Sequence, residues 1–221
     1  MHEHISNKKI KIYFFSKQYM IKKKINKINY KSIEDFEGKD FLIPNQIHST
    51  NVNFSNTPGR FDNCDGVFTS NPKVVCSIRV ADCMPIFFAH QYLSFYGVVH
   101  AGWKGLTNGI LKNTSVLLKK MKFKLSNFDI FIGPSIQKCC FEVSDDVVNR
   151  FPSKYVKKKS DGKFKVDLQN IAFEELNSFG FSDDKINITD ECSYCIKDTY
   201  FSYRRDGADT KRMIGFIGFE V

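Results

Sequence analysis

The chain has 221 residues, of which 42% are hydrophobic and 26% charged, and its formal net charge is +9. These values are typical of an ordinary globular protein that can bury a sizeable core. No apolar run reaches the roughly 18 residues of a membrane-spanning helix, and the Lys-containing N-terminus does not match a signal peptide. We therefore predict one cytoplasmic domain over residues 1–221, with no membrane partner.

The positive charge is concentrated in two Lys-rich segments, residues 22–31 and 154–165. Neither segment has the Arg and aromatic pattern of a base-stacking surface. A solvated face is the simpler interpretation, so we predict no nucleic-acid partner. The rival hypothesis, non-catalytic nucleic-acid binding, would require affinity that falls steeply with salt and no turnover.

Short apolar runs separated by turn residues predict a β-rich first half. Residues 9–15 alternate between apolar and polar side chains as in a half-buried strand. Six further strands are expected between Phe41 and His100, with turn signals such as Asp65-Gly66 between them, at residues 41–43, 51–54, 67–69, 74–80, 86–89 and 95–100.

After Gly105 the pattern changes to a helical period, with one apolar stripe at Ile110, Thr114, Leu117, Leu118 and Met121. The sequence VVHAGWKG (residues 98–105) is thus expected to join a strand to a helix. The remaining expected elements are a strand at 129–132, a helix opened by Ser144, a helix between Asp167 and Gly180, and strands at 200–203 and 213–219. This mixture predicts an α/β fold with a substantial sheet.

Three potential metal ligands, His48, Cys83 and His100, each follow or end a predicted strand. Two imidazoles and one thiolate suit zinc and leave its fourth tetrahedral position open to water, as in catalytic zinc sites. Their spacing matches no local zinc motif. A hydrogen-bonded half-buried histidine and a cysteine acting as a small hydrophobe remain the alternatives.

Arg204 and Arg205 supply two guanidinium groups that suit a phosphate or carboxylate, although a surface pair balanced by Asp206 and Asp209 is the alternative. The chain also has seven cysteines, an odd number that includes the adjacent pair Cys139-Cys140, which favours reduced thiols, with metal ligands among them as an alternative, over disulfides. The C-x-x-C segment at residues 192–195 has no second motif beside it in the sequence. We interpret it as packing or a local thiol pair.

The segments NQIHST, DGVFTSNPKVVCSIRVADCMPIFF, VVHAGWKGLTNGIL, IGPSIQKCCFEV, CSYC and YFSYRRDG occur in the order of the conserved blocks of the YfiH family. The chain resembles this family, once called the multicopper polyphenol oxidase or laccase-domain family, from about Phe41 to Gly218. The resemblance implies a single α/β domain with layered mixed sheets flanked by helices. It also implies one zinc ion held by His48, Cys83 and His100, with copper as the second choice.

Purine nucleosides and phosphate are the substrates that this resemblance implies. The expected reactions are phosphorolysis of adenosine, inosine, guanosine and methylthioadenosine, and hydrolytic deamination of adenosine by a zinc-activated water. Lys104, Arg204 and Arg205 are the candidates for binding phosphate, together with backbone amides of residues 102–105. The general acid is open, with three candidates: Asp82, Glu142 and Cys140.

Three positions differ from the family pattern. Ser49 replaces the Gly that commonly follows the histidine, Lys104 replaces the usual Arg, and Lys211 occupies the Gly of a typical T-G-R. A second enzymatic hypothesis uses the same residues, with Cys83 as nucleophile and His100 as base in an amidase acting on a peptidoglycan precursor. A multicopper oxidase would need many histidines, and the chain has only five.

Overall fold

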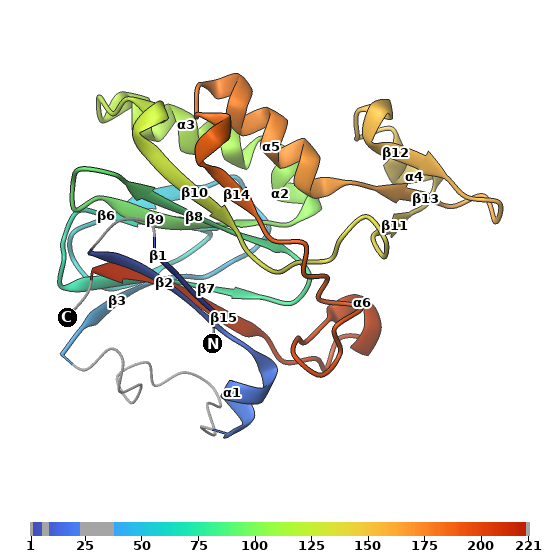
Figure 1. Cartoon of the computed structure of the whole chain (residues 1–221), viewed down its shortest axis with the longest axis horizontal. Helices are drawn as coiled ribbons and strands as arrows, with labels where there is room; N and C mark the ends of the chain where they lie inside the picture. Colours follow the sequence, from blue (N-terminus) through green and yellow to red (C-terminus); the bar gives the residue numbers. More distant parts are fainter. Residues whose placement is uncertain (1, 6–8, 23–37, 220–221) are drawn as a thin grey trace.

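The structure, a computed structural model, describes residues 2–5, 9–22 and 38–219. These residues form three layers: one six-stranded sheet, a second six-stranded sheet packed on it, and helices on the outer face of the second sheet (Figure 1). A small three-stranded sheet lies beside the helices. The predicted class, a single α/β domain with layered mixed sheets and flanking helices, is confirmed.

The first sheet has the strand order β1-β2-β15-β7-β3-β5. Its parallel pairs are β3 with β7 and β3 with β5, and its other neighbours are antiparallel. The strands are β1 His2–Ile5, β2 Ile10–Phe15, β3 Asp40–Pro44, β5 Gly59–Phe61, β7 Val74–Val80 and β15 Met213–Phe219. Because β3 and β7 are parallel neighbours, the segments that follow them leave the sheet at the same edge.

The second sheet has the strand order β14-β10-β8-β9-β6-β4. Its strands are β4 Val52–Phe54, β6 Gly66–Thr69, β8 Met84–His90, β9 Tyr96–Ala101, β10 Phe128–Ile132 and β14 Ile186–Ile188. Every residue of β8 and β9 is buried. Both faces of these two strands are covered, which explains why they are mostly apolar runs in the sequence and do not alternate with polar residues.

The helices and the third sheet complete the described chain. The third sheet consists of β11 Glu142–Val143, β13 Phe164–Val166 and β12 Val156–Lys158. The helices are α1 Lys17–Lys22, α2 Trp103–Thr107, α3 Ile110–Lys120, α4 Asp145–Val148, α5 Leu168–Phe179 and α6 Tyr203–Asp206, with 3-10 turns at Leu125–Asn127, Ser153–Tyr155 and Asp183–Lys185. None of the helices in the described ranges is long and apolar enough to cross a bilayer.

Two hydrophobic cores lie on opposite faces of the second sheet. Phe87 and Val98 belong to the core between the sheets, whereas Phe88 and Val99 belong to the core beneath the helices. Adjacent residues of one strand thus serve different cores, as the alternation of side chains in a strand requires. The second sheet is therefore the rigid centre of the protein.

Most of the predicted elements are confirmed, including the strand-to-helix junction at VVHAGWKG and the helix between Asp167 and Gly180. The prediction of a strand at residues 200–203 is wrong. Ser202 accepts a hydrogen bond from the Arg205 amide and caps the short helix α6. A local cap has overridden the aromatic strand pattern of this segment.

The two Lys-rich segments differ in what the structure describes. Residues 23–31 of the first segment lie outside the described ranges. In the second, Lys159 contacts Glu142 at 2.6 Å and Asp161 at 2.8 Å, and Lys154 pairs with Glu174. Part of the positive charge of this segment is thus balanced locally.

We predict that Gly97→Ala destabilises the protein by about 3 kcal/mol. A Cβ atom at this position of β9 would lie 2.2 Å from the Phe68 ring and 2.5 Å from the Val67 carbonyl oxygen. The matched control is Gly59→Ala, whose Cβ would meet nothing within 4 Å. Urea denaturation of both variants measures the difference, and equal stabilities would contradict this account of the sheet.

Candidate metal centre

Two features of the topology bring His48, Cys83 and His100 together. His48 follows β3 and Cys83 follows β7, so both lie near the C-terminal ends of these neighbouring parallel strands. Cys83 also precedes β8, whose Pro85 is paired in register with His100 of β9. The potential ligand atoms of the three residues all lie within 4.8 Å of one another.

Asp65 organises this group of side chains. It is completely buried, and its carboxylate accepts hydrogen bonds from the backbone amides of Ile47, His48 and Ser49 at 2.7–3.2 Å. It also lies 2.8 Å from Nδ1 of His100. One buried carboxylate thereby fixes two of the three potential ligands.

The loop that carries His48 is held in an unusual conformation. His48 has a φ of 61°, in the left-handed region that non-glycine residues rarely adopt and that costs about 1 kcal/mol or more. The Asp65 carboxylate offsets this strain by accepting hydrogen bonds from the backbone amides of the loop. Gln46 adds a second attachment, because its side chain exchanges two hydrogen bonds with the backbone of Arg79 on β7.

Ser49 strengthens the same attachment. Its hydroxyl donates to Asp65 Oδ2 at 2.7 Å, in addition to the hydrogen bond from its amide. The residue that departs from the family's usual Gly thus supplies a hydrogen bond that glycine lacks. The loop around His48 is secured by side-chain as well as backbone contacts.

Hydrogen bonding to Asp65 determines which nitrogen of His100 is free. Nδ1 faces the carboxylate, so Nε2 is left as the potential ligand atom. Burial opposes charging of His100, but Cys83 and Asp65 outweigh it and raise the pKa of this imidazole. Burial also opposes charging of Asp65, yet the hydrogen bonds from His100 and Ser49 lower its pKa to about 2.

Cys83 lies in a tight turn against the backbone. A Cβ atom on Gly102 would stand 2.8 Å from its Sγ, so only glycine leaves room for the thiol there. Burial alone would raise the pKa of Cys83, but the adjacent His100 and His48 lower it. The environment therefore favours the thiolate, which is the form that binds metal and acts as a nucleophile.

The three residues fit a mononuclear metal site. Cys83 Sγ lies 3.9 Å from His48 Nε2, close to the roughly 3.6 Å expected for two ligands of a tetrahedral zinc ion. His100 is buried, Cys83 half-buried and His48 exposed, so the group opens to solvent on the His48 side. Three protein ligands with one open side are typical of catalytic rather than structural zinc.

The predicted phosphate-binding residues have different surroundings. Lys104 is exposed on α2, with its ammonium 5.7 Å from the Trp103 ring. Arg204 is exposed, and its guanidinium lies over the Phe141 ring. Both cations are exposed, and within the part of the chain that the structure describes each contacts an aromatic ring.

The guanidinium of Arg205, in contrast, is already engaged in contacts within the protein. It donates to the carbonyl oxygens of Ser193, Tyr194 and Tyr200 and to the Asp206 carboxylate. These hydrogen bonds indicate a structural role for Arg205. Phosphate binding by this residue stays a prediction that no contact supports.

The three general-acid candidates are likewise engaged elsewhere. Asp82 accepts hydrogen bonds from the Ser193 hydroxyl at 2.6 Å and the Arg204 amide at 2.7 Å. Glu142 pairs with Lys159, and Cys140 lies 3.3 Å from another cysteine sulfur. The side chains of Asp82, Glu142 and Cys140 are thus all held by contacts within the protein, and none of these contacts supports a role as general acid.

Sequence reasoning missed Asp65 and Gln46. The segment Asp65-Gly66 was interpreted as a turn signal, whereas Gly66 in fact begins β6. The burial of Asp65 and its hydrogen bonds to the loop around His48 exist only in the folded protein, so no local sequence pattern marks it. Gln46 carries no signal of its own, since its partner is the backbone of a distant strand.

The geometry defines an α/β protein in which two histidines and one cysteine form a group that could hold a metal ion, at the ends of its strands. The family described as multi-copper polyphenol oxidoreductase laccase matches residues 22–220. The chain belongs to this family.

Several curated relatives carry the name purine nucleoside phosphorylase. The protein from Haemophilus influenzae is 34% identical over 183 residues, which cover 79% of this chain and 72% of the relative. YlmD of Geobacillus stearothermophilus is 32% identical over 163 residues, which cover 70% of this chain and 59% of that protein. The chain therefore spans little more than half of the second relative's length.

Solved structures share the fold. The crystal structure of YlmD from Geobacillus stearothermophilus has a TM-score of 0.79 at 27% identity and covers 84% of this chain and 76% of its own. Bacillus licheniformis YfiH has a TM-score of 0.84 at 24% identity and covers 96% of this chain and 93% of its own. The predicted membership of the YfiH family is confirmed.

We predict that Asp65→Asn lowers metal affinity by about 10- to 100-fold, because the partners of His48 and His100 are lost. Competition with a coloured chelator measures this affinity. The control is Asp62→Asn, since Asp62 is exposed and contacts Asn45. Unchanged affinity in Asp65→Asn would contradict the assigned role.

Asp65 also predicts a pH dependence of stability. Its pKa is about 2 in the folded protein and near 3.8 when unperturbed, so its contribution is present above about pH 4 and is lost as pH falls toward 2. This contribution amounts to about 2 kcal/mol. Urea denaturation of metal-free protein should show a gap between wild type and Asp65→Asn that narrows with acid; a constant gap would contradict it.

Proposed function

We propose that the protein is a zinc-dependent purine nucleoside phosphorylase that also deaminates adenosine, acting in the cytoplasm. The observation that carries the proposal is the convergence of His48, Cys83 and His100 into one open-sided ligand group. The names of the relatives support the substrate class. Adenosine, inosine, guanosine and methylthioadenosine are the proposed nucleosides, with orthophosphate as the second substrate.

The described residues would act mainly by positioning charge. A zinc ion held by His48, Cys83 and His100 would supply Lewis-acid polarisation of an oxygen atom or water. Asp65 keeps the proton of His100 on Nδ1 and leaves Nε2 for the ion. Gly102 allows the backbone to approach Cys83 closely, which keeps the thiolate shielded on one side.

Phosphate would be bound by two exposed cations, Lys104 and Arg204, on segments that contact the turn carrying Cys83. Lys104 follows Gly102, which contacts Cys83, by two residues. The Arg204 backbone amide donates a hydrogen bond to the carboxylate of Asp82, the residue before Cys83. Both cations are thus tethered beside the group, where they would orient phosphate toward the C1′ atom of the ribose.

The direct test incubates metal-quantified protein with adenosine, with and without phosphate. Phosphorolysis yields adenine and ribose 1-phosphate only when phosphate is present, whereas deamination yields inosine and ammonia in either case. We predict that Cys83→Ala loses the metal and that both of its activities fall by about 100-fold or more. Cys76→Ala, in the core between the sheets, should keep the metal and both activities. A zinc-free Cys83→Ala protein with full activity would refute the proposal.

A second pair of variants separates the two reactions. We predict that Lys104→Gln raises the KM for phosphate about tenfold, because a charge-assisted hydrogen bond is lost, and leaves deamination unchanged. Lys112→Gln, on the exposed side of α3, is the control. Steady-state kinetics with varied phosphate measure the effect, and an equal loss in both reactions would contradict a phosphate-binding role.

One observation favours the alternative, a cysteine amidase acting on a peptidoglycan precursor. Cys83, His100 and Asp65 have the arrangement of nucleophile, base and orienting carboxylate, and the thiol pKa is lowered. An amidase would survive chelation and be inactivated by iodoacetamide. The zinc enzyme would be silenced by chelation, so this comparison decides between the two.

A further inference from the structure

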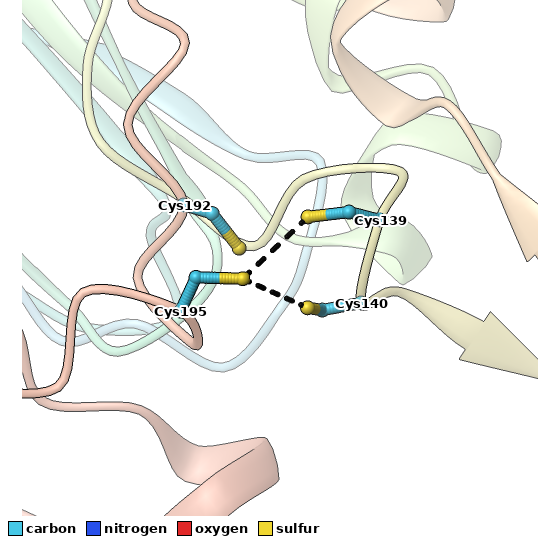
Figure 2. A group of neighbouring side chains, drawn as sticks. All are labelled: Cys139, Cys140, Cys192 and Cys195. Carbon is cyan, nitrogen blue, oxygen red and sulfur yellow. Dashed lines mark hydrogen bonds between the residues drawn. The ribbon is translucent and has the colours of Figure 1, made fainter.

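A second group of metal-binding side chains lies outside the site already described. Cys139 and Cys140 are on the loop after β10, and Cys192 and Cys195 are on the loop before α6 (Figure 2). The four sulfur atoms all lie within 4.8 Å of one another. The sequence interpretation of residues 192–195 as packing or a local thiol pair thus missed the second pair of cysteines that the fold brings beside it.

We propose that these four cysteines bind a single structural zinc ion. In a tetrahedral four-thiolate site with bonds of about 2.3 Å, neighbouring sulfur atoms are about 3.8 Å apart. The Cys139–Cys195 sulfur distance is 3.8 Å and the Cys140–Cys195 distance is 3.3 Å. A polynuclear iron–sulfur cluster would hold its cysteines further apart, because several metal ions and sulfides stand between them.

Backbone hydrogen bonds shape both loops. The amides of Cys140 and Phe141 donate to the Gln137 carbonyl oxygen at 2.9 Å, which forms the turn that presents the first cysteine pair. The Ile196 amide donates to the Cys192 carbonyl oxygen at 3.0 Å and closes the second turn. Ligands on two preformed turns lose little conformational entropy when they bind an ion.

The surroundings also suit bound thiolates. The Gln137 amide points at Cys192 Sγ, with a nitrogen–sulfur distance of 3.5 Å. The Arg205 guanidinium donates to the carbonyl oxygens of Ser193 and Tyr194, so a fixed positive charge stands beside the second cysteine loop. Both features partly balance the two excess negative charges of a four-thiolate zinc site.

Four thiolates fill the coordination shell, so this ion would have a structural and not a catalytic role. The two loops that it joins also contact the turn before Cys83. The Ile136 amide donates to the Asp82 carbonyl oxygen, and the Ser193 hydroxyl donates to the Asp82 carboxylate. The ion would therefore secure one wall of the first metal-binding group.

Metal counting on the full chain, purified anaerobically under reducing conditions, tests this proposal without any assay of activity. Native mass spectrometry and elemental analysis should find two zinc ions per chain. Cys195→Ser, a change at an exposed position, should remove one ion, and Cys83→Ala should remove the other. Cys76→Ala is the control and should keep both.

Cobalt substitution provides a second measurement that does not depend on the folding of Cys195→Ser. Cobalt-loaded Cys83→Ala protein should show the intense absorption of a four-thiolate tetrahedral site. A wild-type protein whose single zinc is lost in Cys83→Ala but kept in Cys195→Ser would overturn the proposal. So would iron in place of zinc, or a mass two protons lower that reveals a disulfide among the four cysteines. If the single ion were instead lost in Cys195→Ser, this proposal would stand and the first metal site would fail.

Discussion

The buried carboxylate of Asp65 is the interaction on which the arrangement of the first metal-binding group depends. It fixes the backbone of the loop that carries His48 and the ring of His100 at the same time. A carboxylate without water is costly unless nearly all of its oxygen lone pairs are used, and here the donors come from two different layers of the fold. Because the buried carboxylate needs these donors, its hydrogen bonds also align two potential metal ligands, His48 and His100.

The two-sheet architecture explains how this alignment arises. His48 and Cys83 follow the parallel neighbours β3 and β7, so they lie at the same end of the first sheet. His100 lies on β9, which is buried and paired with β8, the strand that begins directly after Cys83. Of the three residues only His100 lies within a strand of the central sheet, where side chains move less than on loops. The exposed cations Lys104 and Arg204 are attached to this frame by short segments, which suits their proposed role in binding phosphate.

Much of this could be read from the sequence, and the failures have physical causes. His48, Cys83 and His100 were predicted because each follows or ends an apolar run. Asp65 was missed because its role depends on hydrogen bonds to distant residues, which no local pattern records. The helix α6 was missed because a single Ser202 cap outweighs the aromatic strand signal. The four-cysteine group was missed because its two pairs meet only when the loops after β10 and before α6 are folded together.

The most direct test of the central claim is X-ray absorption spectroscopy at the zinc edge on Cys195→Ser protein, in which only the first site is expected to hold metal. The account predicts one sulfur ligand from Cys83 and the remaining ligands nitrogen or oxygen, with two imidazoles from His48 and His100. A protein without bound metal, or a shell made of sulfur alone, would contradict it.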